Sequence, residues 1–315
     1  MRSGFWGLIA LLAAGALAAI IAVIVAFLRD GKRRFQVFAN RAHLWVADDV
    51  ITTAVMRRLR HNSIGNAVGV LIGVVVTAVW LLISRPDDVN TFVWATALPV
   101  LLIATITIPM VLAVTDQLYR ADPAESRVAR VSPLTVRDYV SPVRFWLVPV
   151  IAAIAVVLLI VGCVAAAAGI IDARAYFRSP ALITVAGVMV LALAGALVAR
   201  ILVGSQQPAA DRLELAWSDA LRAETIRSLW VFEATVVWLG LVQAGLGILA
   251  ALDPPVASSW TTIILLLSMD AGIIGLGQLF TRGGAHSYYR YRLWPSLGDV
   301  GEIVEGSDAQ AERRS

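Results

Sequence analysis

Seven long apolar blocks divide this chain, and they constrain its fold more than any other feature. Each is close to the length of about 20 apolar residues that a helix needs to cross a hydrocarbon core about 30 Å thick. The blocks cover residues 5–28, 64–83, 92–114, 145–171, 182–203, 230–252 and 260–280. Because backbone amides and carbonyls find no water in lipid, each block must be helical. The first block is too long for the apolar region of a cleaved signal peptide, so we count it as a helix.

Composition agrees with a membrane protein. Of the 315 residues, 59% are hydrophobic and 15% are charged, and the mean hydropathy is +0.79. Soluble domains carry about 45–50% apolar and about 25% charged residues. The net charge of +4 does not indicate a nucleic-acid partner, because the basic residues are scattered between the apolar blocks. We therefore predict an all-α fold, a polytopic membrane helical bundle with seven transmembrane helices.

The positions of Lys and Arg predict the orientation of this bundle. Four basic residues lie in the N-terminal segment and in the loops after the second, fourth and sixth blocks, namely Arg2, Arg85, Arg174 and Arg178. All the others lie in the loops after the first, third and fifth blocks and in the C-terminal tail, if Arg144 and Arg200 are assigned to the loops they border. By the positive-inside rule, the N-terminus lies outside and the C-terminus lies in the cytoplasm.

Two similar charged stretches each precede an apolar block: ADDVITTAVMRRL at residues 47–59 and WSDALRAETIRSL at residues 217–229. Asp49 aligns with Asp219, and Arg57 aligns with Arg227. In each stretch the apolar residues form one helical stripe. We interpret each as a cytoplasmic elbow, an amphipathic helix that lies near the membrane surface before turning into a span.

Further matching pairs downstream indicate an internal repeat of three helices. If the first three helices match the last three, the two triplets run in the same direction. Successive spans cross the membrane in opposite directions, so one further helix must lie between the triplets. This gives a 3+1+3 arrangement with parallel repeats, which occur in transporters. The alternative is that Ala/Val/Leu-rich helices resemble one another by composition alone. The predicted units are residues 1–119, the first repeat; 120–179, a surface segment and the linking helix; 180–280, the second repeat; and 281–315, a cytoplasmic tail that is partly disordered.

A single acidic residue near the middle of the last block is the first candidate for a functional site. Asp270 should face protein or a wet cavity, because insertion scales assign about 2.5–3.5 kcal/mol to an aspartate at that depth. Gln243, Thr105 and Thr107 lie at compatible depth and complete a candidate midplane polar site. The site would bind a substrate or a proton; the alternative is a neutral aspartic acid bonded to a neighbouring helix.

Other polar residues in the blocks have structural interpretations. Glu233 lies about one turn inside its span, where it should reach water or Arg227, and Arg200 should extend to the cytoplasmic headgroups. Gly65, Gly69 and Gly73 share one face, and small residues at this spacing let another helix approach closely.

Enzyme chemistry is not expected. His43, His61 and His286 lack the His-Glu-x-x-His spacing, and the motifs Gly-x-Ser-x-Gly and Gly-x-x-x-x-Gly-Lys-Ser/Thr are absent from the sequence. A single cysteine, Cys163, excludes an internal disulfide. We expect no metal and no cofactor.

Two segments carry a family resemblance: SPLTVRDYVSP before the fourth block, and QQPAADRLELAWSDALRAETIRSL before the sixth. Both resemble uncharacterised multi-span integral membrane proteins of high-GC Gram-positive bacteria. The resemblance implies a multi-pass protein of a bacterial plasma membrane and implies no activity.

Two functions fit these features. The first is a transport component, either a small carrier or the membrane subunit of a transporter complex. The second is a non-catalytic scaffold or regulator that assembles partners through helix packing. The expected partners are the lipid bilayer, a cytosolic protein at the basic loops and a second copy of the chain, with no nucleic acid.

Overall fold

The computed structural model describes residues 13–17, 19–21, 24–25, 31–42, 44, 49–84, 98–118, 134–179, 181–205, 212–252, 268, 271–272, 274–280 and 288–294. Its regular elements are helical, and no strand occurs among these residues. In chain order they are α2 (Gly31–Ala42), α3 (Asp49–Ser84), α5 (Leu98–Leu118), η2 (Val136–Asp138), α6 (Pro142–Ala167), α7 (Ala173–Arg178), α8 (Ala181–Gly204), α9 (Arg212–Ala251) and α11 (Tyr288–Leu293). The predicted all-α fold is confirmed.

Four helices are long and apolar enough to cross a membrane: Thr52–Ile83 in α3, Pro142–Ala167 in α6, Leu182–Gly204 in α8 and Glu214–Ala251 in α9. They correspond to the second, fourth, fifth and sixth predicted blocks. The third block corresponds to α5, whose apolar part Ile103–Asp116 is shorter. Much of the first and last blocks lies outside the described residues, so the count of seven stays a prediction.

The predicted elbows are wrong. Residues 47–59 and 217–229 do not form separate surface helices; their described parts belong to α3 and α9, which run without interruption for 36 and 40 residues. No glycine or proline lies between either charged stretch and its span, so nothing there breaks the helix. Both stretches therefore extend their spans beyond the length that lipid requires.

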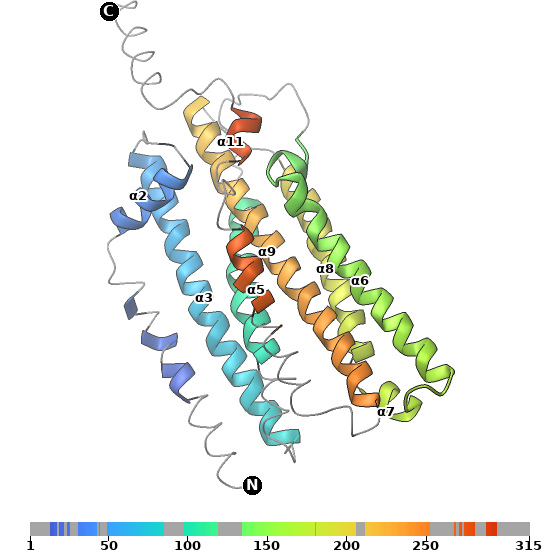
Figure 1. Cartoon of the computed structure of the whole chain (residues 1–315). Helices are drawn as coiled ribbons and strands as arrows, with labels where there is room; N and C mark the ends of the chain where they lie inside the picture. Colours follow the sequence, from blue (N-terminus) through green and yellow to red (C-terminus); the bar gives the residue numbers. More distant parts are fainter. Residues whose placement is uncertain are drawn as a thin grey trace, which may run out of the picture.

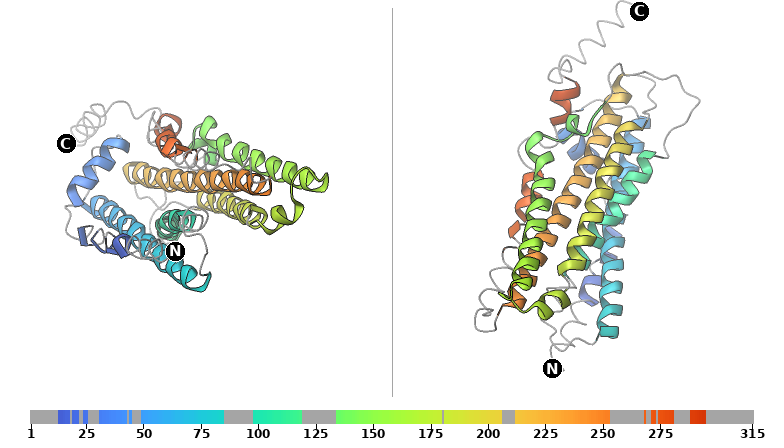
Figure 2. Two further views of the ribbon diagram at one scale, coloured as in Figure 1. Left: turned by 60° about the horizontal axis from the view of Figure 1, so that its bottom comes forward. Right: turned by 90° about the vertical axis from the view of Figure 1, so that its right-hand side faces the viewer.

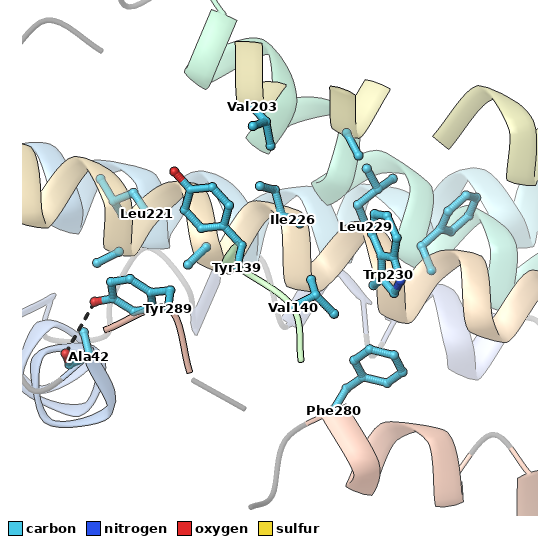
Figure 3. Close-up of a cluster of buried hydrophobic side chains, with 14 of the residues drawn as sticks. Ala42, Tyr139, Val140, Val203, Leu221, Ile226, Leu229, Trp230, Phe280 and Tyr289 are labelled. Atoms are coloured by element: carbon cyan, nitrogen blue, oxygen red, sulfur yellow. Dashed lines mark hydrogen bonds between the residues drawn. The ribbon is translucent and has the colours of Figure 1, made fainter. Parts of the chain in front are cut away.

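Helix α9 is the axis of the bundle. Figure 2 shows it between α6 on one side and α5 and α8 on the other. Within its most apolar window 61% is buried, against 22–33% for the other three candidate spans. Figure 3 shows the core around it, where Ile226, Leu229 and Trp230 of α9 meet Val203 of α8 and Phe280.

The helices alternate in direction. Helices α3, α6 and α9 begin, and α5 and α8 end, at the end of the bundle where α2 and α11 lie (Figure 1). We call this the α11 end. The described arginines lie toward it, except Arg174 and Arg178 of α7 at the opposite end. This asymmetry supports a cytoplasmic α11 end, and the orientation stays a prediction, as do the repeat and the four predicted units.

The three glycines of the α3 face contact α5 of the same chain. A Cβ on Gly69 would lie 2.5 Å from the Ala104 carbonyl oxygen and 2.9 Å from the Thr105 Cα. Gly65 and Gly73 face the α5 backbone at Pro109 and Leu101 in the same way. The glycines thus allow two backbones to meet, and this face is occupied inside the bundle.

Candidate functional site

The predicted midplane site of Asp270, Gln243, Thr105 and Thr107 stays a prediction. Asp270 lies outside the described residues. Thr105 and Thr107 donate their hydroxyl hydrogens to carbonyls of their own helix, those of Leu101 at 2.7 Å and Ile103 at 2.6 Å. Gln243 is buried on α9. The two threonines therefore satisfy their hydroxyls locally, as Ser and Thr in helices often do.

The aligned charges of the two stretches have different surroundings. Asp49 and Arg57 are exposed on α3. Asp219 is fully buried on α9, and Arg227 pairs with Glu224 one turn before it. The sequence match therefore does not extend to the contacts of these side chains.

Asp219 holds the α11 segment on the bundle. Its carboxylate accepts hydrogen bonds from the Trp294 indole at 2.9 Å and from the Tyr139 hydroxyl at 3.2 Å. Nearby, the Tyr289 hydroxyl donates to the carbonyl of Ala42, a contact drawn in Figure 3. Elements from four parts of the sequence thus converge on the start of α9.

A second link to α11 is the ion pair of Arg292 with Asp138, at 3.3 Å. Burial raises the pKa of Asp138, but hydrogen bonds from the backbone and hydroxyl of Thr135 and from Arg292 outweigh it and hold that pKa below its ordinary value. The carboxylate is therefore stabilised in its charged form.

Several arginines at the α11 end bind helix carbonyls. Arg227 donates to the Phe280 carbonyl and Arg144 to that of Leu279. Arg222, only 2% exposed, donates to the carbonyls of Val203 and Ser205 at the end of α8. Cations at helix C-termini satisfy carbonyls that lack intrahelical partners.

Arg58 links the two charged stretches directly, because it donates to the Thr225 hydroxyl and the Leu221 carbonyl of α9. A cavity of about 300 Å³ lies beside this contact, between α3, α5 and α9. Its lining includes His61, whose Nδ1 lies 3.6 Å from the Asp116 carboxylate. Acidic and basic side chains both line the cavity, so it carries no strong preference for one charge.

A larger cavity lies between α6 and α8 and reaches α9. Its volume is about 970 Å³ and its lining is mainly apolar. The surrounding surface includes Trp146 and Leu193, which are 54% and 72% exposed, so the cavity opens on the outside of the bundle. We call it the α6–α8 groove. If α6 and α8 cross a membrane, as their length and composition allow, the groove faces lipid.

Glu233 lies at the inner wall of this groove, and the interpretation given to it from the sequence is wrong. The residue is 2% exposed, and its Oε1 has no hydrogen-bond partner within the described part of the chain. Arg227, its expected partner, pairs with Glu224 instead. An isolated charge is strongly disfavoured in such surroundings, so burial favours the uncharged acid.

Two arginines and Thr135 line the groove toward the α11 end. Arg200 is exposed on the last turns of α8. The Arg137 guanidinium lies 5.0 Å from the centre of the Phe145 ring and 5.7 Å from that of Trp146. The groove therefore combines a basic rim, an apolar wall and one buried carboxyl group.

No group of three or more His, Cys, Asp or Glu side chains suited to a metal occurs in the described ranges. No protein-family model, curated protein or solved structure matches the chain. The fold places the chain in a broad class, that of helical proteins, with four helices long and apolar enough to cross a membrane. The resemblance to membrane proteins of high-GC Gram-positive bacteria remains a prediction.

Proposed function

We propose that this protein is a membrane transport component that takes an amphipathic molecule from the bilayer through the α6–α8 groove. The observation that carries the proposal is Glu233, a buried carboxyl group without a partner for Oε1 among the described residues, at the wall of a lipid-facing cavity. A membrane protein that only needed stability would fill this position with an apolar side chain, because polar groups in spans are expensive.

In this proposal Glu233 is the polar residue that binds the ligand, the role that the sequence analysis predicted for Asp270. Its carboxyl group can donate a hydrogen bond when neutral and accept one when charged, so it can hold a polar group of a moving ligand. Because α6 and α8 both pack on α9, a small shift of either helix would change the width of the groove.

The test is lipid translocation in vesicles. The purified chain is reconstituted with fluorophore-labelled phosphatidylglycerol or phosphatidylcholine, and dithionite then bleaches the label in the outer leaflet. We expect near-complete bleaching with the wild type and about half with Glu233→Leu. Asp49→Asn, which changes an exposed carboxylate on α3, should behave as the wild type.

If vesicles with wild-type protein bleach no further than protein-free vesicles for either lipid, the chain is not a carrier of these molecules by itself. The membrane-subunit form of the proposal is then examined by gentle purification of the tagged protein. An ATPase that stays bound would support that form, and its absence would reject it.

The scaffold function remains the second candidate, on a different basis from the glycine face. That face is filled by α5, but exposed basic residues such as Lys32, Arg57 and Arg60 lie at the α11 end. They offer a surface for an acidic cytosolic protein, and the same purification experiment would identify it.

A further inference from the structure

We infer that the α6–α8 groove binds one anionic glycerophospholipid, with its phosphate at Arg137 and Arg200 and an ester carbonyl at Glu233. This inference rests on the proposed function, because it names the ligand class of the same site. Its acyl chain would follow the apolar wall of the groove.

The charges of the groove favour an anionic headgroup. Arg200 and Arg137 are both exposed at its α11 end, and Glu233 is the only acidic residue among the described residues that line the groove. Guanidinium groups bind phosphate oxygens through two parallel hydrogen bonds, which makes Arg well suited to such a headgroup. Thr135 in the same rim adds a hydroxyl donor.

The depth of Glu233 matches the next polar group of a glycerophospholipid. A Cβ on Gly195 of α8 would meet the Glu233 carboxyl group, so this group lies at the level of Gly195. Arg200 is five residues further along α8, which corresponds to about 7.5 Å along the axis. In a glycerophospholipid the ester carbonyls follow the phosphate after one glycerol unit, in the same order from the membrane surface inward.

The protonated carboxyl group of Glu233 can donate to such an ester carbonyl. This would give its buried Oε1 a partner, which that atom lacks among the described residues. A ligand with only hydrocarbon below its phosphate would leave the carboxyl group unsatisfied. The groove therefore favours a glycerol ester over a simple chain phosphate.

The remaining lining suits a hydrocarbon chain. Pro149 and Ala152 of α6 face Met189 and Leu193 of α8 across the groove. The volume of about 970 Å³ lies at the upper end of the about 300–1,000 Å³ usual for ligand pockets. The site has room for a molecule of lipid size.

The test is equilibrium binding in detergent, where translocation plays no part. Wild-type protein is titrated with phosphatidylglycerol, phosphatidylcholine and inorganic phosphate, and bound molecules are counted by native mass spectrometry. We expect one phosphatidylglycerol to bind at least tenfold more tightly than phosphatidylcholine, and no retention of phosphate alone.

Two pairs of variants locate the site. Arg200→Gln should weaken phosphatidylglycerol binding about tenfold, the loss of one charge-assisted hydrogen bond. Arg57→Gln, an exposed arginine of α3 outside the groove, should not. Gly195→Ala should also weaken binding, because its methyl group displaces the Glu233 carboxyl group. Gly187→Ala on the same helix meets open space and should bind normally.

The outcomes separate the two proposals. Equal affinity for both lipids, or unchanged binding in Arg200→Gln, overturns the inference. Translocation of the fluorophore-labelled lipid in vesicles would still uphold the transport function. Selective binding that Arg200→Gln weakens about tenfold, without any lipid translocation in vesicles, upholds the inference and overturns the carrier function.

Discussion

Asp219 shows how one buried carboxylate can hold distant segments together. It accepts hydrogen bonds from Tyr139, which precedes α6, and from Trp294, which follows α11. Both donors are themselves buried. A buried donor that loses its acceptor destabilises the fold by the full desolvation cost of that donor. Asp219 should therefore contribute more to stability than the exposed Asp49, with which it aligns in sequence.

Asp219→Ala should therefore destabilise the protein by about 1–3 kcal/mol, because the Trp294 indole and the Tyr139 hydroxyl lose their acceptor. The measurement is the thermal unfolding midpoint in detergent. Asp49→Ala, at the aligned position of α3, is the matched control and should change stability by less than about 0.5 kcal/mol. Equal shifts in both variants would contradict the difference in burial.

The ion pair of Asp138 with Arg292 should weaken in acid. Because the folded pKa of Asp138 is lowered, its contribution is complete above the ordinary value of 3.8 and is lost as the pH falls through the lower folded value. A nitroxide at Tyr291→Cys, in a Cys163→Ser background, should become more mobile in that range. Asp138→Asn removes the titrating group and should reduce the pH dependence; an identical acid profile would disprove the role of Asp138.

Individual side chains were the least predictable from the sequence. Asp219 and Glu233 look like ordinary polar residues near a span end, since their burial is set by α6, α8 and α11, which lie far away in sequence. A glycine at position 195, which leaves space for the Glu233 carboxyl group, becomes meaningful only when the register of α8 against α9 is known. Asp270 was the more visible candidate because its depth follows from sequence alone.

At the scale of elements, the contact of α3 with α5 depends on the absence of side chains at three positions. Gly69 faces backbone atoms of Ala104 and Thr105, which cannot rotate away as a flexible side chain could. The spacing of the glycines predicted close packing correctly, although the sequence did not reveal which helix would occupy the face.

Gly69→Ala should therefore force α3 and α5 apart and destabilise the protein by about 1–3 kcal/mol, the usual range for overpacking. The midpoint of thermal aggregation in detergent measures this effect. Gly187→Ala, with open space around the new methyl group, controls for the change in helix propensity. Normal stability with loss of co-purifying proteins would instead show that this face binds a partner.

Helix boundaries were predictable from the sequence where the length of an apolar block determines them. They were not predictable where contacts with other helices determine them. The apolar blocks located most of α6 and α8 and the C-terminal halves of α3 and α9. The charged stretches before two of them were expected to bend along the membrane, as amphipathic segments do. Contacts such as that of Trp217 with Phe35 of α2, whose rings stack at 5.4 Å, support the α9 stretch as a continuation of its span.

For the whole molecule, the charge asymmetry predicts which end faces the cytoplasm. Phe177 on α7 and Tyr291 on α11 are both exposed, at opposite ends of the bundle. In a Cys163→Ser background, Phe177→Cys should react with a membrane-impermeant maleimide in intact cells. Tyr291→Cys should react only after permeabilisation, and the reverse pattern would refute the positive-inside assignment.

The axial position of α9 also has a consequence for biosynthesis. Among the described spans, α9 is the last to leave the ribosome, and it is the least apolar, with a hydropathy of 1.8 against 3.1 for α6. Helices α6 and α8, which pack mainly on α9, are thus made before the helix that they contact most. A ribosome that stalls before residue 212 would therefore leave the α9-facing sides of α6 and α8 without their partner, while α3 and α5 could still pack on each other.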